Sequence, residues 1–352
     1  MPQQTSSSAH PSGPPVSTVT PPALAEAPVL VHVTRGGVVE SVHRASVAVT
    51  ASDGSVLQAW GDPHDPVFPR SSNKPLQSVA MVRAGLDLPP HHLALASASH
   101  SAEPFHLDAV RDMLAAAGLT EADLQNTPDL PYDPEERDVW IAAGRAARSL
   151  AQNCSGKHAA MLATCRVNGW DIATYRDPRH PLQQLMAQTI ADLAGEPVAA
   201  MAVDGCGAPV MAISLAGLAR AFGRVAAADP GTHEGRVADA IRQHPEYLGG
   251  TRRDVTALIQ GTQGVIAKDG AEAVYAVGLA DGRGIALKIA DGGQRARPVV
   301  LAAVLRRLGV ESSAYERLES APILGHGQPV GAVVAADLDG TMSVGGSTTN
   351  DA

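Results

Sequence analysis

The sequence has few aromatic residues and no cluster of basic ones. Phe, Trp and Tyr together make up 3% of the 352 residues, which leaves little for ring-stacking platforms or aromatic interfaces. The formal net charge is −9, and no segment gathers the Lys and Arg side chains that phosphate binding needs. These two shortages argue against a nucleic-acid partner.

Long apolar runs are missing as well. No stretch reaches the roughly 20 consecutive apolar residues of a membrane-spanning helix, so no membrane partner is expected. Residues 1–27 are rich in Pro, Ser and Thr, and they lack the basic start and continuous apolar run of a secretory signal. We therefore expect a cytoplasmic protein with a disordered leader (1–27), one folded domain (28–338) and a polar tail (339–352).

Cysteine is scarce too, since the chain has only three. Cys154, Cys165 and Cys206 are too few for a disulfide framework. An intracellular thiol is usually either a small buried hydrophobe or part of a site. Cys154 and Cys206 lie in Gly-rich polar segments, whereas Cys165 lies on the face of a predicted helix. We expect Cys165 to be structural, while Cys154 and Cys206 can be either structural or part of a site.

Apolar residues are plentiful: they make up 45% of the chain, enough to bury a substantial core. Short apolar runs between turn signals predict strands at residues 29–34, 45–50, 56–60 and 330–335, and a hairpin at 274–289. Apolar periodicity predicts helices at residues 75–86, 107–117, 157–167, 181–194, 209–222, 235–244 and 298–308, while 93–98 fits either a strand or a helix. Strands at both ends with helices between them predict an α+β fold.

Ser71 and Lys74 stand three residues apart, directly before Pro75 at the start of a predicted helix. Such positions share one helix face with Cβ atoms about 5–6 Å apart, so the lysine amine can reach the hydroxyl. A serine becomes a useful nucleophile when a base takes its proton, and a desolvated lysine can be that base. The neighbouring Arg70 can hold a carboxylate with two hydrogen bonds. The spacing alone is common on exposed helices, but the tight entry before Pro75 is unusual.

A second polar segment follows the apolar run 93–98. Ser99, His100, Ser101 and Glu103 place four hydrogen-bonding side chains within five residues, where a solvated loop is the alternative to a site. Farther along, Lys268 precedes a Gly turn at the entry to the predicted hairpin. This lysine either points into a cleft or belongs to an ordinary surface turn.

Two further segments carry a cysteine just before a predicted helix. Cys154 is followed by Lys157 and His158, and Cys206 lies between two glycines. Helix N-termini favour thiolates, and thiolates bind zinc. Two cysteines with a nearby histidine can form a metal site. Structural thiols are the alternative, and the spacing alone favours them.

Taken together, these segments resemble the asparaginase II family, the Rhizobium-type or class 3 L-asparaginases, over most of the chain. The matching wording is Pro69-Arg70-Ser71 with Lys74, Ser97-Ala98-Ser99-His100-Ser101 with Glu103, Asn153-Cys154-Ser155-Gly156-Lys157-His158, Asp204-Gly205-Cys206-Gly207, and Lys268 with Gly270-Ala271-Glu272. Several segments in the right order are a more specific signal than any one of them.

The resemblance implies a fold similar to the serine β-lactamases and glutaminases, an antiparallel sheet with helices packed on it, usually in a homodimer. It implies that residues 28–338 form a catalytic domain in which Ser71 pairs with Lys74, and Ser99 with Lys268. It also implies zinc beside the site, assisting substrate binding, with Cys154, Lys157 and Cys206 as ligands. The substrate-binding positions that it implies are Arg70, His100, Glu103, Asn153, His158 and Asp204.

The function that the resemblance implies is hydrolysis of L-asparagine to L-aspartate and ammonia. An L-glutaminase of the same fold is one alternative. A penicillin-interacting serine hydrolase is another, because it shares Ser-x-x-Lys with a downstream Lys-x-Gly. A catalytically silent amino-acid- or metal-binding protein is the third. Departures from the family wording, such as Ala102 and an Arg within residues 250–254, leave the predicted catalytic set intact but affect the expected substrate affinity.

Overall fold

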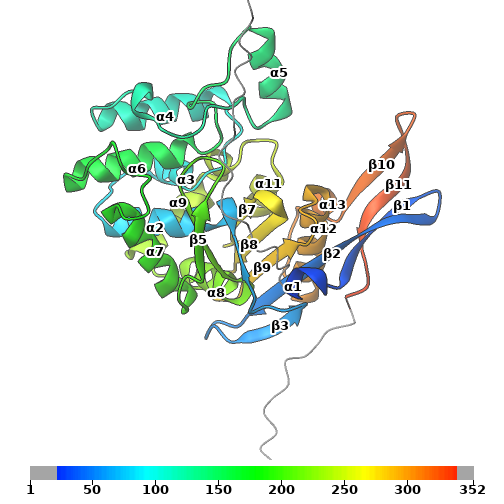
Figure 1. Ribbon diagram of the computed structural model, residues 1–352. Coiled ribbons are helices and arrows are strands. Elements are labelled where there is room, and N and C mark those ends of the chain that lie inside the picture. Colours follow the sequence, from blue (N-terminus) through cyan, green and yellow to red (C-terminus); the bar gives the residue numbers. More distant parts are fainter. Residues whose placement is uncertain (1–21, 339–352) are drawn as a thin grey trace, which may run out of the picture.

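The computed structural model describes residues 22–338. Its centre is an eight-stranded sheet in the order β10-β11-β1-β2-β9-β8-β7, with β3 also pairing with β2, and the pairings are antiparallel (Figure 1). A three-stranded sheet has the order β4-β6-β5. The strands are β1 (Val29–Arg35), β2 (Val38–Thr50), β3 (Val56–Trp60), β4 (Pro66–Val67), β5 (Ala200–Val203), β6 (Pro209–Ser214), β7 (Ile266–Gly270), β8 (Val274–Gly278), β9 (Gly284–Ile289), β10 (Ser320–Gly325) and β11 (Gln328–Ala335).

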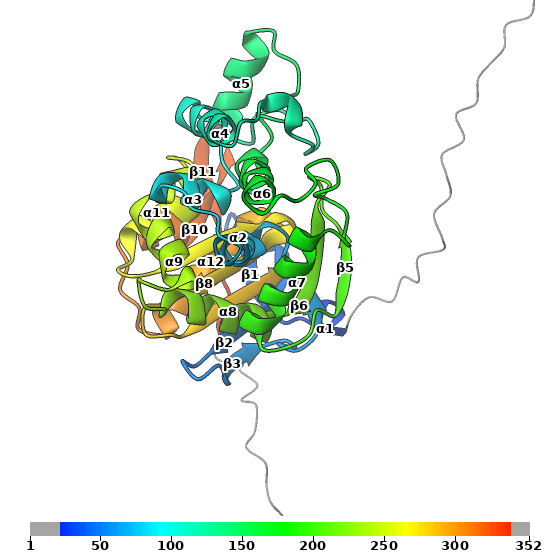
Figure 2. The ribbon, with the colours of Figure 1, turned by 90° about the vertical axis from the view of Figure 1, so that its left-hand side faces the viewer.

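Helices cover both faces of the central strands. Figure 2 shows α2, α7 and α8 together on the near side of the sheet, with α12 behind it. The helices are α1 (Pro22–Ala25), α2 (Lys74–Arg83), α3 (Pro90–Ala96), α4 (Pro104–Ala116), α5 (Pro134–Ala142), α6 (Ser155–Asn168), α7 (Pro181–Ala194), α8 (Leu215–Ala226), α9 (His233–Gln243), α10 (Pro245–Leu248), α11 (Asp254–Gly261), α12 (Arg297–Arg307) and α13 (Tyr315–Leu318). Short 3-10 turns are η1 (Arg70–Asn73), η2 (Glu121–Asp123), η3 (Ala271–Ala273) and η4 (Gln294–Ala296). As a result, β8 and β9 are buried along their whole length.

Two glycines allow α8 to lie directly against the sheet. A Cβ at Gly278 would lie 2.1 Å from Phe222 O, and a Cβ at Gly284 would lie 1.8 Å from Ala219 O. A side chain at either position would push the helix away, so the absence of one permits this close approach. The contact fixes the helical layer against the strands that lead to the predicted site.

The α+β expectation is confirmed, and so is most of the predicted order of elements. The three predicted N-terminal strands pair in an antiparallel meander, and the hairpin at 274–289 turns at Gly282, whose φ is 88°. Residues 93–98, which fitted either type of element, belong largely to helix α3 (Pro90–Ala96).

The prediction of one helix over residues 209–222 is wrong in its first half. Pro209–Ser214 is the buried strand β6, and α8 begins at Leu215. Ser214 ends the strand and caps the helix, because its Oγ accepts the N–H of Gly217 at 2.9 Å. A fully buried strand and a buried helix segment have the same apolar composition, so periodicity could not separate them. The sequence patterns also missed α5, α11 and β10.

The predicted leader overlaps the described residues only at its end. Residues 22–25 form the short helix α1, and Ala27 is buried. Residues 1–21 of the leader and the predicted tail lie outside the described residues. Over residues 22–338, the structure has no helix that is long and apolar enough to cross a membrane.

Candidate active site

Lys74 lies at the point where three of the predicted segments meet. It opens α2, and its buried amine donates to Ala98 O at 2.5 Å, to Ser99 Oγ at 3.0 Å and to Cys154 Sγ at 3.1 Å. A lysine amine has three N–H groups when protonated, and two with a lone pair when neutral, so the neutral form can keep two of these contacts and accept a proton. The lysine therefore ties the start of α2 to the loop after α3 and to the N-terminus of α6.

Ser71 lies on η1, just before Lys74, and is only partly buried. The backbone N–H of Lys74 donates to Ser71 O, but within residues 22–338 no side-chain hydrogen bond joins Ser71 to Lys74 or Ser99 to Lys268. The structure thus brings the predicted catalytic residues into one region, but the contact that it forms is between Lys74 and Ser99. The Lys74 side chain reaches Ser99 by extending toward Ala98 O instead of along the surface of its own turn.

Lys268 reaches the same region from β7. A Cβ at Gly270 would lie 2.6 Å from Pro69 O, so this strand end packs directly against the turn that carries Ser71. The Lys268 amine is fully buried and donates to Asp269 Oδ1 at 2.6 Å and to Asp269 O at 2.7 Å. Burial, together with the nearby Lys74, lowers the pKa of Lys268 to about 8 against the pull of the Asp269 carboxylate. Such an amine can give and take protons near neutral pH.

The two predicted zinc-ligand cysteines lie together with Lys157. Its amine donates to Cys206 Sγ at 3.2 Å. A hydrogen bond to Cys206, with burial, raises the pKa of the Cys154 thiol to about 12, and the same bond holds the pKa of Cys206 well below its usual range. Burial alone would lower the pKa of Lys157, but Cys206 and Cys154 raise it. In this state the cluster is a thiol, a thiolate and an ammonium.

Cys154 and Cys206 fit a zinc site only if the amine nitrogen of Lys157 is the third ligand. Among residues 22–338, no three His, Cys, Asp or Glu side chains are grouped closely enough to hold a metal ion. Two sulfur ligands and one amine nitrogen suit the soft character of zinc and leave a fourth position open. The ligand set fits, provided that Cys154 and Lys157 both lose a proton.

His158 and His100 are both fully buried, and they differ in their free nitrogens. His158 Nδ1 lies 2.6 Å from Tyr175 Oη, while its Nε2 has no hydrogen-bond partner. His100 Nδ1 accepts the N–H of Ala102 at 3.1 Å, so Nε2 carries the proton and donates to Ser155 Oγ at 2.8 Å. His100 thus braces the loop after Ser99 against α6, whereas His158 keeps one unpaired nitrogen.

Arg70 and Glu103 hold the loops around the site. Arg70 Nε donates to Asp204 Oδ1 at 2.7 Å, and its side chain also approaches Glu272 at 4.0 Å. Glu103 accepts the N–H and the hydroxyl of Thr251, each at 2.8 Å. Asn153 is also predicted to bind substrate, and its side-chain oxygen accepts a hydrogen bond from Cys154 Sγ at 3.1 Å. Their direct contact with a substrate stays a prediction.

Backbone strain is concentrated at this site. Of the five non-glycine residues with positive φ in the described part of the chain, four flank the predicted catalytic residues. They are Arg70 (52°), Ala102 (63°), Glu272 (54°) and Ala273 (52°). Such conformations cost energy and tend to occur where function requires them, so their clustering supports an active site here.

Sequence reasoning missed Asp269, Arg253 and Lys288. Arg253 donates to Ser99 O at 3.3 Å and to Asp269 Oδ2 at 2.5 Å. Lys288 donates to Glu272 O at 2.7 Å and so holds the strained turn η3. A usable signal was present, because the chain has only four lysines and all four are buried. A lysine inside the apolar strand Gly284–Ile289 is therefore a candidate for a specific contact.

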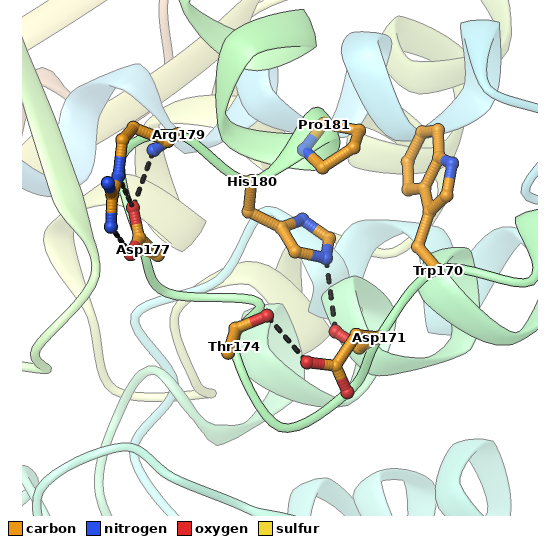
Figure 3. Close-up of a pocket in the computed structure, with 7 residues that line it drawn as sticks. All are labelled: Trp170, Asp171, Thr174, Asp177, Arg179, His180 and Pro181. Carbon is orange, nitrogen blue, oxygen red and sulfur yellow. Dashed lines mark hydrogen bonds and ion pairs between the residues drawn. The ribbon is translucent and has the colours of Figure 1, made fainter.

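A hollow of about 420 Å³ lies on the outer side of the loop before α7, and no predicted site residue lines it (Figure 3). Its lining residues are Trp170, Asp171, Thr174, Asp177, Arg179, His180 and Pro181. The polar ones pair with each other: Thr174 donates to Asp171 at 2.7 Å, and Arg179 binds Asp177 at 3.0 Å. These contacts stabilise the loop, whose Tyr175 side chain reaches His158.

Serine hydroxyls beside buried lysines on an α+β scaffold are the components of a serine hydrolase. The family model of L-asparaginase II matches residues 31–335, and the chain belongs to this family, as its motifs predicted. No curated protein matches it.

Solved structures that resemble the chain include hydrolases. A β-lactamase from Mycobacterium bovis is 13% identical, with 81% of this chain and 97% of that one covered and a TM-score of 0.43. Mglu, described in one structure as an L-glutamate binding form, is 12% identical, with 76% and 65% covered and a TM-score of 0.37. EstCE1, a hydrolase with promiscuous acyltransferase activity, is 13% identical, with 77% and 91% covered and a TM-score of 0.34.

Proposed function

We propose that this protein hydrolyses L-asparagine to L-aspartate and ammonia through a serine–lysine mechanism. The observation that carries the proposal is the buried Lys74 amine, 3.0 Å from Ser99 Oγ and at the end of the turn that exposes Ser71. Membership of the L-asparaginase II family supports the choice of substrate. Two serines and two lysines at one site supply both a nucleophile and groups that move protons.

Ser71 is the proposed nucleophile because it is the more accessible of the two serines. Its Oγ attacks the side-chain amide carbon of asparagine, and its proton passes to the Lys74–Ser99 pair. Protonation of the leaving nitrogen releases ammonia and leaves an aspartyl ester on Ser71. A water molecule then attacks the ester and gives a proton to Lys268. As the bond between Ser71 Oγ and the aspartyl carbon breaks, Lys268 returns this proton to Ser71 Oγ, and aspartate leaves.

Arg70, with Glu103 and Asp204, is proposed to hold the amino-acid end of the substrate. Arg70 lies beside Ser71, and its side chain is about one quarter exposed, at 26%. A guanidinium can share a substrate carboxylate with Asp204 through different N–H groups. The positive φ of Arg70 directs this side chain to its place beside the turn.

A zinc ion held by Cys154, Lys157 and Cys206 belongs to the proposal. When bound, the ion would supply a positive charge next to the substrate pocket. The chain's own contribution is to bury the two sulfurs and the amine and to exclude water around them. Free thiols of this kind also favour a reducing, cytoplasmic location.

A homodimer is part of the proposal as well. The strands β1, β2, β10 and β11 extend as arms from the body of the molecule (Figure 1). Exposed apolar side chains on these arms are Val38, Val39, Val42, Leu324 and Val330. Burying them against a second copy would remove this apolar surface from water. Light scattering on the protein and on Val39→Lys tests the assembly, and an unchanged mass in the variant argues against this surface.

An ammonia-release assay on L-asparagine and L-glutamine tests the function. We expect faster release from asparagine, and loss of release in a folded Ser71→Ala protein. Ser99→Ala should reduce the rate without abolishing it, because Lys74 then loses only one of its partners. Release from neither amide would favour a silent binding protein, and labelling by a fluorescent penicillin would favour a penicillin-interacting enzyme.

A further inference from the structure

Asp269 holds the amine of Lys268 with two oxygens of one residue. The side-chain oxygen Oδ1 accepts at 2.6 Å and the backbone oxygen at 2.7 Å. A neutral amine has two N–H groups and one lone pair, in a tetrahedral arrangement. If both N–H groups donate to Asp269, the lone pair points in the remaining direction. Asp269 thus fixes where Lys268 can accept a proton.

Asp269 is itself held by two arginines. Arg253 donates to its Oδ2 at 2.5 Å, and Arg297 approaches the same atom at 3.4 Å. Although burial alone would raise the pKa of Asp269, Lys268, Arg253 and Arg297 hold it well below its usual range. The carboxylate therefore stays ionised, and its Oδ1 remains an acceptor for the amine.

The charges of this buried cluster balance when Lys268 is neutral. Arg253 and Arg297 are the permanent cations, and Asp269 and Asp254 are the carboxylates, with Arg297 bound to Asp254 at 3.0 Å. A protonated Lys268 leaves one positive charge in excess in a buried region, with Lys74 as a further cation nearby. Unbalanced buried charge is costly, so the cluster favours the neutral amine.

We propose that Asp269 is a positioning residue that holds both N–H groups of the neutral Lys268 amine and so aims its lone pair at the reacting water. The inference rests on the proposed function, in which Lys268 accepts a proton from that water. Arg253 links this pair to the rest of the site, because the same guanidinium donates to Ser99 O at 3.3 Å and lies over the Tyr132 ring. A purely structural ion pair would also shift the titration of Lys268, but moving the carboxylate while keeping its charge would then leave proton transfer unchanged.

The titration of Lys268 can be measured directly by NMR of protein labelled with [13C]lysine, because the chain has only four lysines. Lys268→Met assigns the signal. Removing the carboxylate charge in Asp269→Asn takes away an attractive neighbour, so the midpoint of Lys268 should fall by about 1–3 pH units. The acid limb of kcat should move in the same direction. An unchanged midpoint in the folded variant would overturn the proposal.

Asp254→Asn is the matched control, since it removes a carboxylate from the same cluster without touching Lys268. Its Lys268 midpoint should shift less than that of Asp269→Asn, and an equal shift would contradict a specific role for Asp269. Asp269→Glu keeps the charge and moves the carboxylate, so kcat should fall at least about tenfold while the midpoint stays near that of the wild type. Unchanged kcat in folded Asp269→Glu would also overturn the proposal. The NMR titration needs no substrate, so it stands apart from a failure of the proposed activity.

Discussion

Two buried lysines of this region, Lys157 and Lys268, have pKa values shifted in opposite directions. Burial opposes the charge of both. Lys157 lies 3.2 Å from the thiolate of Cys206, and the thiolate and its neighbours raise its pKa. Lys268 lies closer to a carboxylate, at 2.6 Å, yet burial lowers its pKa to about 8. The difference is that Asp269 already neutralises two arginines, so an adjacent anion does not by itself decide the charge of a buried lysine.

Replacing each lysine by methionine should give the largest contrast. Lys268→Met removes the proposed proton acceptor of the hydrolysis step and should lower kcat by roughly 10³-fold, within the usual range for general acid–base groups. Lys157→Met removes a proposed zinc ligand beside the thiols and should cost less than about 10²-fold, mainly through KM. Steady-state kinetics on asparagine measure both. Equal losses of activity in the two variants would contradict the proposed difference in function between the two lysines.

The pH dependence of the reaction should report Lys268 alone. A proton acceptor must be neutral, so kcat, which includes the hydrolysis of the acyl-enzyme, should rise with pH through about 8 and fall roughly tenfold per unit below it. Lys157 takes no part in the proposed proton transfers and should contribute no limb. A rate that stays constant over about three pH units around neutrality, roughly from pH 6 to pH 9, would contradict the role of Lys268.

A buried histidine leads to a parallel prediction for the stability of the fold, because burial opposes its charged form too. His106 has a pKa of about 4 in the folded protein, lowered by burial from 6.5. The unfolded chain therefore binds more protons between these values, so stability should fall as the pH drops from about 6.5 to 4. His106→Gln, which can still donate to Glu246 O, should flatten this loss by on the order of 3 kcal/mol. Denaturant unfolding at several pH values checks it, and an unchanged slope would show that burial of His106 is not the cause.

Cys206→Ser should have the smallest effect on turnover and a clear effect on metal content. Loss of the thiolate removes a proposed zinc ligand and lowers the pKa of Lys157 toward that of Lys268. We expect zinc content to fall while kcat changes less than about tenfold, because the metal is not a reactant in the proposed steps. Cys165→Ser is the control, since that buried cysteine lies on α6 away from Lys157. Equal zinc content in both variants and the wild type would contradict the ligand assignment.

The sequence predicted the segments of the site better than their contacts. Ser71, Lys74, Ser99 and Lys268 come from separate places in the chain and meet in one region, as the motif order implied. Spacing paired Ser71 with Lys74, but the fold directs the lysine to Ser99, because Ala98 O and Ser99 Oγ lie where its amine ends. Contacts of this kind depend on packing between elements, and local spacing carries no information about them.

Asp269 shows a second limit of prediction from the sequence. It directly follows Lys268 in the sequence, yet alternation along a strand places neighbouring side chains on opposite faces, so a contact between them was not expected. The lysine amine nevertheless turns back to both oxygens of its neighbour. Arg253 and Arg297, which keep Asp269 ionised, arrive from the start of α11 and from α12. Only the assembled fold brings these charges together.

The central claim is tested most directly by trapping the covalent intermediate. The protein is mixed with L-asparagine, quenched in acid within the first turnovers, digested and examined by mass spectrometry. The account predicts an adduct with the mass of one aspartyl group on the peptide that carries Ser71. Ammonia release without any adduct, or an adduct on the peptide that carries Ser99, would contradict it.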